Sequence, residues 1–370
     1  DARPGLLGLS LGRLRQGDET EIDRHLSVGL LDLLLWPWRS AAADRRIDVA
    51  EQKQALAVLQ HAQSVRQQWI VAVAAQARVR YLGDQLAAAD LTAELARRLH
   101  GTGQYSAAQR DARVSAALEA RLSQTVAAQQ ARREREALIR LIGLRGEEAQ
   151  ALRLPDALPG VPAQPRWTPA TIESAARQGR LDLKLAESRW RAARGQARSD
   201  IARSLVDIEL GVERNSVSDS PTQRGATLDI RLMSIDLGAA RREAVRQEEQ
   251  AALAEWEQRA ADAESQLRDA WADHEATLAT AREVSSMLMA VRQQLLEERL
   301  KQYNGMLISP LDLLDEARAH AGSVMTALDA LRDYWLADAA IQAAVEGTEP
   351  TSSPGRAPDT ATASTPAAAH

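Results

Sequence analysis

Hydrophobic residues in the second half of the chain recur at alternating steps of three and four, the period of a coiled-coil helix. The pattern predicts a long antiparallel helical hairpin over residues 239–346. Tyr303-Asn304-Gly305 supplies the turn, and Pro310 suits the first position of the returning helix. The expected seam consists of Leu253, Trp256, Ala260, Ala263, Leu267, Ala270, His274, Thr277, Ala281, Val284, Leu288, Val291 and Leu295, and then of Leu314, Ala317, Ala321, Val324, Leu328, Leu331 and Trp335.

A similar hairpin is expected in the first half of the chain, over residues 40–147. Gly101-Thr102-Gly103 breaks its first helix, and Ser106 opens the returning one. Alanine at many seam positions lets helix backbones approach closely, which suits tight packing of long helices. The seam of the first helix contains Val65, Trp69, Ala72, Gln76, Val79, Leu82, Leu86 and Leu99.

Ahead of each hairpin, in residues 1–39 and 201–238, hydrophobic and polar residues alternate one by one, which predicts two pairs of β-strands. Turn-prone loops at 16–21 and 215–225 separate the strands of each pair. One hydrophobic and one polar face fit either a share of a water-filled barrel in lipid or a soluble sheet with one solvated face. The alternating hydrophobic residues are Leu7, Leu9, Leu11, Ile22, Leu26, Val28, Leu30, Val206, Ile208, Leu210, Val212, Leu228, Ile230 and Leu232.

The chain is therefore expected to be an internal repeat of a strand pair and a long hairpin. In the second copy a helix over residues 169–200 precedes the strands, with Thr168 as its N-cap and Pro169 at its first position. A Pro-rich linker, residues 148–168, joins the copies, and residues 347–370 have the composition of a disordered tail. The expected fold is mixed and mainly α, with two long antiparallel coiled-coil hairpins and four β-strands.

The composition argues against several classes of function. The 370 residues carry a net charge of −5 with interleaved signs, so no basic surface is expected for nucleic acid. The absence of cysteine removes disulfides, thiolate metal sites and cysteine nucleophiles. No run approaches the roughly 18 apolar residues of a transmembrane helix. No phosphate loop, nucleophile elbow or HExxH motif is present, so neither an enzyme nor a cofactor is expected.

The histidines and methionines do not predict a metal site. The six histidines show no i, i+4 pair and no clustered carboxylates. His274 falls on the helical seam, where a packed polar layer is the simpler interpretation. Met287 and Met289 could offer thioether sulfur to Cu(I), but two residues apart on a helix they lie on different sides.

Several segments resemble one protein family, the TolC family of outer-membrane efflux channels. Residues 180–193 (RLDLKLAESRWRAA), 231–238 (RLMSIDLG) and 299–317 (RLKQYNGMLISPLDLLDEA) are similar to family motifs at the second repeat, the strand-to-helix junction and the hairpin turn. Residues 9–23 (LSLGRLRQGDETEID) and 333–338 (DYWLAD) resemble the branch associated with copper and other heavy-metal efflux.

The resemblance implies a homotrimer in the bacterial outer membrane that extends into the periplasm. Each protomer would contribute four strands to one barrel in the lipid bilayer and its hairpins to one helical tunnel. Its partners would be a periplasmic adaptor (membrane fusion) protein and an inner-membrane efflux pump, and exported substrates, metal ions among them, would pass through it passively. The resemblance also implies a signal peptide and a helix before the first strand, so the first repeat is incomplete at its N-terminus.

Asp312 and Asp315 are the leading candidates for a functional site. They lie three residues apart after the turn and so share a helix face. They match an aspartate pair that lines the narrow periplasmic entrance in the family, where three copies would surround the pore with carboxylates. The alternative is that both are first-turn carboxylates favoured by the helix dipole. The first repeat has Gln109 and Ala112 at the equivalent positions.

The hairpin turns are the expected adaptor contacts, on the same resemblance. Gly103 precedes Ser106 by three residues, and Gly305 precedes Ser309 by four. The alternative is a flexible turn followed by a serine N-cap.

The resemblance assigns the strand-to-helix junctions to Pro37 in the first repeat and to Asp236 and Gly238 in the second. The rival to the channel is a soluble periplasmic coiled-coil adaptor or scaffold protein. Such an adaptor has no need for two widely separated strand pairs ahead of matching hairpins.

Overall fold

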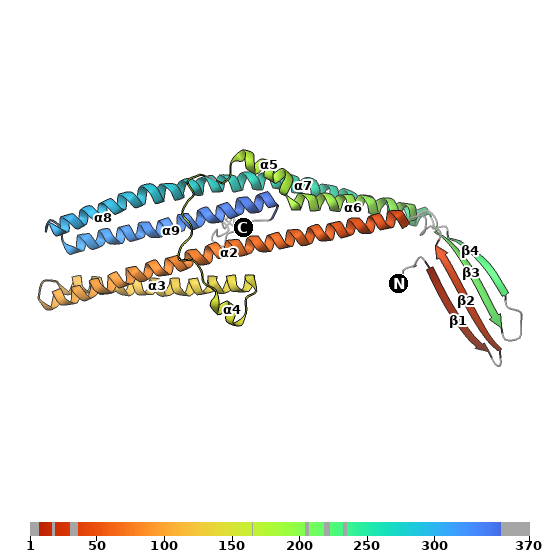
Figure 1. The fold of residues 1–370 in the computed structure, drawn as a ribbon, viewed down its shortest axis with the longest axis horizontal. Coiled ribbons are helices and arrows are strands. Elements are labelled where there is room, and N and C mark those ends of the chain that lie inside the picture. The colour runs from red at the N-terminus through yellow and green to blue at the C-terminus, as the bar shows by residue number, and fades with distance from the viewer. Residues whose placement is uncertain are drawn as a thin grey trace, which may run out of the picture. The chain divides into compact units, whose positions relative to one another are not determined.

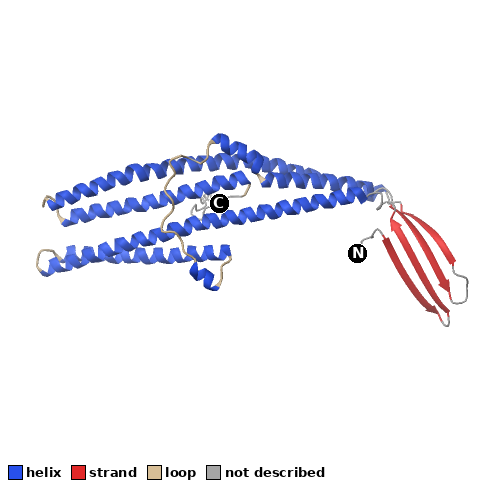
Figure 2. Cartoon of the chain, viewed as in Figure 1, coloured by secondary structure: helices blue, strands red, loops and turns tan. Residues whose placement is uncertain are grey.

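The computed structural model describes residues 7–16, 19–29, 36–164, 166–203, 207–217, 223–231 and 235–348. Within these residues helices dominate and four strands complete the fold, which confirms the mainly α expectation (Figures 1 and 2). The chain divides into two compact units, each built from both repeats. The strand unit comprises residues 1–56 and 181–262, and the helical unit comprises residues 57–180 and 263–370.

The strand unit contains one antiparallel sheet in the order β1-β2-β3-β4. The two predicted strand pairs therefore join through β2 and β3. The strands reach further into the predicted loops than expected, and only residues 17–18 and 218–222 separate the paired strands. Leu30, Val206 and Leu232 lie outside the described residues. The strands are β1 (Leu7–Gln16), β2 (Glu19–Gly29), β3 (Asp207–Val217) and β4 (Gln223–Arg231).

The register aligns the alternating hydrophobic residues of the four strands on one face, whereas Leu14 and Val217 fall on the other. Leu210 lies opposite Val28 and Leu228, because neighbouring strands pair without a bulge. Successive residues alternate between faces, so this face holds the odd-numbered residues of β1 and the even-numbered residues of β2, β3 and β4. We call it the hydrophobic face, and the opposite one the polar face. Leu26, Leu210, Val212 and Leu228 are between 42% and 59% exposed on it.

The helices of the strand unit are α6 (Leu181–Arg203) and the first parts of α2 (Trp36–Gly101) and α7 (Ile235–Glu283). The indole rings of Trp190 and Trp256 stack with centroids 6.1 Å apart, which joins α6 to α7. Both long helices begin a few residues before the expected boundaries at 40 and 239.

The helix expected over residues 169–200 is two helices. Thr168 caps α5 (Pro169–Gly179), as predicted, and its side chain accepts a hydrogen bond from the backbone N–H of Thr171. The helix then breaks at Arg180, whose ψ of 105° is extended, before α6 begins. Arg180 is buried, and its guanidinium donates to the carbonyl oxygens of Ala263 (3.2 Å) and Ala344 (3.1 Å). The break thus places a buried cation against the last turn of α9 (Pro310–Glu346), where the helix dipole favours it.

The first hairpin of the helical unit pairs α2 with α3 (Ala107–Ile142), followed by the short α4 (Gly146–Ala151) (Figure 1). The side-chain amide of Gln68 donates to the carboxylate of Glu134 at 2.7 Å. Nearer the turn, Arg121 donates to Asp90 at 3.3 Å. These contacts join the two antiparallel helices at two points along their length.

The second hairpin departs from the predicted seam. A π-helical turn, η1 (Val284–Leu288), interrupts the long helix and separates α7 from α8 (Met289–Asn304). A π-turn takes in an additional residue, which rotates the face presented by the following helix. The predicted seam is therefore wrong beyond the turn, because Val291 is 60% exposed. The less exposed residues of α8 are Met289, Arg292, Leu296, Arg299 and Gln302.

The last half of α9 is the centre of the helical unit. Ala339 packs with Ile70 and Val73 of α2, and Ile341 and Val345 pack with Ile172 of α5. Ala330 and Tyr334 pack against Ala281 of α7. The linker crosses this core, and Trp335 donates its indole N–H to the carbonyl of Pro159 at 2.8 Å. Among the helices described, no stretch combines the length and the apolar character needed to cross a bilayer.

His274 occupies the seam as a packed polar residue, as expected. It is 1% exposed, and its ring lies 5.9 Å from that of Trp271 and 5.5 Å from that of Tyr334. Its nearest charged neighbour is Asp338, whose carboxylate oxygen is 3.8 Å from Nε2, too far for a hydrogen bond. Burial lowers the pKa of His274 below 6.5, and Asp338 offsets part of that effect.

The lowered pKa of His274 predicts a loss of stability in mild acid. The unfolded chain binds the proton of His274 more readily than the folded chain does. The stability contributed by the neutral His274 is therefore fully present above pH 6.5, and it is lost as the pH falls toward the lower pKa of the folded state. We expect the thermal midpoint to fall between about pH 7.5 and pH 5.5, and His274→Leu to weaken that dependence. The exposed His61→Leu serves as the control. An unchanged pH dependence in the His274 variant would contradict this account.

Candidate functional site

Both helix-to-helix turns lie at the same end of the helical unit (Figure 1). Arg113 on α3 and Asp315 on α9 connect the two hairpins near the turns, with Nη1 and Oδ1 3.5 Å apart. The structure therefore brings together the predicted turn residues and the predicted aspartates.

The first turn depends on a left-handed backbone at Gly103, where φ is +78°. The N–H of Gly103 donates to the carbonyl of His100, and the N–H of Gln104 donates to the carbonyl of Leu99. This closes the end of α2 in the manner of a Schellman motif, in which glycine is preferred because it has no Cβ.

In the second turn the left-handed residue is Met306, with φ +58°, and not Gly305. Gly305 has φ −79°, which any residue can adopt. The N–H of Leu307 donates to the carbonyl of Gln302, the counterpart of the bond from Gln104. Met306 therefore corresponds to Gly103 in backbone conformation, and Gly305 lies one residue before that position.

Sequence reasoning missed Met306 and Leu307. They are 94% and 78% exposed, and they place two hydrophobic side chains at the tip of the second turn. A signal was available, because counting back three residues from Ser106 and from Ser309 reaches Gly103 and Met306.

Ser106 and Ser309 both act as N-caps, as the structural alternative proposed. Each forms a capping box with the residue three positions later, Gln109 in α3 and Asp312 in α9. The carboxylate of Asp312 accepts from the Oγ of Ser309 at 2.8 Å and from its N–H at 3.0 Å. These hydrogen bonds lower the pKa of Asp312. The residue three positions after the serine therefore takes part in the helix cap in both repeats, although it is the uncharged Gln109 in the first and Asp312 in the second.

Asp315 has different surroundings from Asp312. Its carboxylate is exposed, with Arg113 of the first hairpin at 3.5 Å and Arg318 of its own helix at 3.9 Å. Both aspartates lie in the first two turns of α9 and face solvent. One is engaged in the helix cap and the other links the hairpins, so substitutions at the two positions have different structural consequences.

The predicted junction residues begin the two long helices. Pro37 is exposed in the first turn of α2, and its carbonyl accepts a hydrogen bond from the Oγ of Ser40. Asp236 and Gly238 lie in the first turn of α7, and their surroundings are outside what the structure describes.

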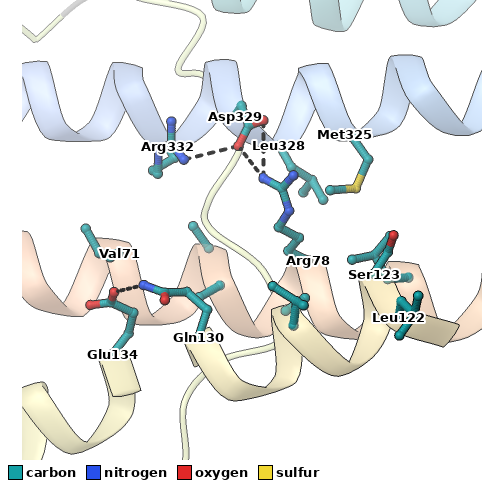
Figure 3. Close-up of a pocket in the computed structure, with 15 residues that line it drawn as sticks. Val71, Arg78, Leu122, Ser123, Gln130, Glu134, Met325, Leu328, Asp329 and Arg332 are labelled. Atoms are coloured by element: carbon teal, nitrogen blue, oxygen red, sulfur yellow. Dashed lines mark hydrogen bonds and ion pairs between the residues drawn. The ribbon is translucent and has the colours of Figure 1, made fainter. Parts of the chain in front are cut away.

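An open groove of 690 Å³ lies between the hairpins, lined by α2, α3 and α9. Figure 3 shows Arg78 of α2 reaching Asp329 of α9, with Nη1 and Oδ1 3.2 Å apart. Arg332 meets the same carboxylate at 3.1 Å. The groove wall formed by α3 is mixed, because the exposed Leu122 and Val126 are followed by the polar Gln130 and Glu134.

The described residues contain no group of three or more histidines, aspartates or glutamates that could hold a metal ion. Met287 is exposed within η1, and Met289 begins α8. The structure therefore adds no metal-ligating group to those considered from the sequence.

Solved structures share this architecture. CusC, described as forming a transmembrane channel, matches with a TM-score of 0.73 and 16% identity over 92% of this chain and 82% of CusC. VceC, an outer-membrane protein of Vibrio cholerae, matches with a TM-score of 0.72 and 16% identity over 92% and 86% of the two chains. The outer-membrane channel MtrE of Neisseria gonorrhoeae matches with a TM-score of 0.74 and 19% identity, over 92% of this chain and 80% of MtrE.

The chain has the fold of the TolC-family outer-membrane channels. The resemblance found in the sequence is thereby confirmed at the level of the fold. The near-equal scores of the three structures do not single out one branch of the family. No protein-family model and no curated protein sequence matches the chain.

The turn geometry predicts that alanine lowers the stability of the protein at Gly103 but is tolerated at Gly305. Gly103→Ala would force an alanine into the left-handed region, at a cost of about 1–2 kcal/mol. Gly305→Ala should be tolerated, because its φ is negative and a Cβ would meet its nearest neighbours at 3.5 Å. Denaturant unfolding followed by circular dichroism measures both changes, and Met306→Gly should be stabilising. Equal destabilisation by both alanines would refute the assignment of Met306.

Proposed function

We propose that the protein is the outer-membrane channel component of a tripartite efflux system. It would conduct exported substrates passively through a trimeric barrel and a periplasmic helical tunnel. The observation that carries the proposal is the exposed hydrophobic face of the four-stranded sheet, on a fold shared with outer-membrane channels.

The sheet supports a barrel made from several copies. β1 and β4 are its two edge strands, and an exposed edge invites pairing with another chain. If β1 of one protomer pairs with β4 of the next, a closed ring removes every edge and turns the hydrophobic face toward lipid. Four strands are too few to close alone, which agrees with a homotrimer.

Exposed hydrophobic residues on α3 also support association of protomers. Leu118, Leu122 and Val126 recur every four residues, so they form one stripe along the helix. We propose that this stripe packs against a second copy of the chain within the trimeric tunnel.

The entrance of the tunnel would lie at the turn end of the hairpins. There Asp312 and Asp315 of three protomers would place six carboxylates around one axis, which favours cations in a narrow hydrated aperture. The exposure of Asp315 supports this role, and the capping bond of Asp312 leaves it charged at neutral pH.

The turns would dock with a periplasmic adaptor protein, which connects the channel to an inner-membrane pump. The proposed contacts are Gly103 and Ser106 of the first turn and Gly305 and Ser309 of the second. Met306 and Leu307 join them, because exposed hydrophobic residues at a turn suit burial in a protein interface.

Metal ions are the cargo suggested by the resemblance of residues 9–23 and 333–338 to the heavy-metal branch. The second segment lies in α9, with Tyr334 and Asp338 buried in the core. It would therefore serve packing rather than contact with cargo.

Conductance tests the proposed function. The detergent-purified protein should form trimers that open cation-preferring pores in a planar bilayer, whereas a soluble, non-conducting monomer would favour the adaptor alternative. The double variant Asp312→Asn and Asp315→Asn should reduce the preference for cations severalfold, because asparagine keeps the cap without the charge. It should also raise conductance, because it removes the Asp315–Arg113 ion pair that links the two hairpins near the turns. Asp273→Asn, an exposed carboxylate on α7, is the control. Identical currents in the double variant and the control would exclude the two aspartates from the entrance.

A further inference from the structure

The charged residues of the sheet are distributed unevenly between its two faces, and Arg231 is the one arginine of the described strands that shares the polar face. Within the described strands, the hydrophobic face carries arginines and no carboxylates. The arginines are Arg13, Arg15, Arg24, Arg214 and Arg224. The polar face carries all the carboxylates of these strands, which are Glu19, Glu21, Asp23, Asp207, Glu209, Glu213 and Asp229.

Three of the arginines form one row across neighbouring strands. Arg24 of β2 pairs with Arg214 of β3, and Arg214 pairs with Arg224 of β4. Leu11 continues the row in β1, where Arg13 follows on the same face. We call Arg24, Arg214 and Arg224 the arginine row.

The arginine row borders the hydrophobic residues on the side of the strand turns. The preceding row on that face is Leu9, Leu26, Val212 and Ala226, and beyond the arginines the chain reaches the turns at 17–18 and 218–222. From Ile208 to Arg214, β3 extends about 20 Å at roughly 3.3 Å per residue. That length approaches the apolar band of membrane barrels, about 25 Å tall.

The arginine row is electrostatically unfavourable unless an anion binds to it. Like charges placed directly opposite each other across strands repel, and this face of the described strands holds no carboxylate to compensate. Membrane barrels commonly mark the edge of the apolar band with aromatic girdles, but the four strands contain no Phe, Trp or Tyr. Arginine suits the same boundary, because its guanidinium binds phosphate through two parallel hydrogen bonds.

We propose that the arginine row binds the phosphate groups of anionic lipid headgroups at the turn-side boundary of the membrane. The inference rests on the proposed channel function, since it requires the hydrophobic face to meet lipid. In a trimer the row would recur three times around the barrel and would tie the channel to the leaflet that contacts the strand turns.

Binding of a phosphorylated lipid to the purified trimer tests the proposal. Native mass spectrometry would compare bisphosphorylated lipid A with its dephosphorylated form, for the wild type and for the triple variant Arg24→Gln, Arg214→Gln and Arg224→Gln. Each basic residue near an anionic surface contributes about five-fold to binding, so the triple variant should bind about 100-fold more weakly. Arg231→Gln, on the polar face of β4, should bind like the wild type.

Two results would overturn the proposal: equal binding of both lipid forms by the wild type, or unchanged affinity in the triple variant. Displacement of the lipid by millimolar inorganic phosphate would also contradict it, because it would indicate a site for the free anion. If the triple variant does not assemble, Arg214→Gln alone, with an expected loss of about five-fold, decides the question. A wild type that forms no conducting trimer would refute the proposed function, whereas a conducting trimer indifferent to lipid phosphate would refute this inference alone.

Discussion

Close packing of small side chains around the last turns of α9 holds the helical unit together. Ala337, Ala339, Ala343 and Ala344 are buried there, and larger residues in their place would push apart the helices that converge on α9. Gly179 contributes to the same contact, because a Cβ at that position would lie 3.3 Å from the carbonyl of Val345. Small side chains at these positions are thus a requirement of the packing.

The sheet imposes the second constraint, because its hydrophobic face and its polar face require two different environments on the two sides of one layer of strands. All carboxylates of the described strands share the polar face, and five of their six arginines and most of their aliphatic residues share the other. In the proposed barrel the acidic face would line the water-filled interior, while Asp312 and Asp315 would line the entrance. A conduit that is acidic at both places favours cations along its length.

Periodicity predicted most of the fold, because helical seams and strand alternation are properties of the sequence alone. The predicted seam is wrong beyond Leu288, because the π-turn adds a residue that the hydrophobic spacing does not reveal. Arg180 looked like part of a motif, yet it breaks a helix and binds carbonyls of two others, which depends on tertiary contacts. At the site, the capping serines followed from local rules. The left-handed conformation of Met306 did not follow from them, because the neighbouring Gly305 has a negative φ and leaves that role to the next residue.

The central claim is that one face of the sheet meets lipid and the other meets water. The chain contains no cysteine, so single cysteines placed along β3 from residue 208 to residue 213 can carry spin labels without background. In liposomes, accessibility to oxygen should peak at the even-numbered positions, and accessibility to a water-soluble nickel complex should peak at the odd-numbered ones. Equal nickel accessibility at all six positions would contradict the account, because it would place both faces of the sheet in water.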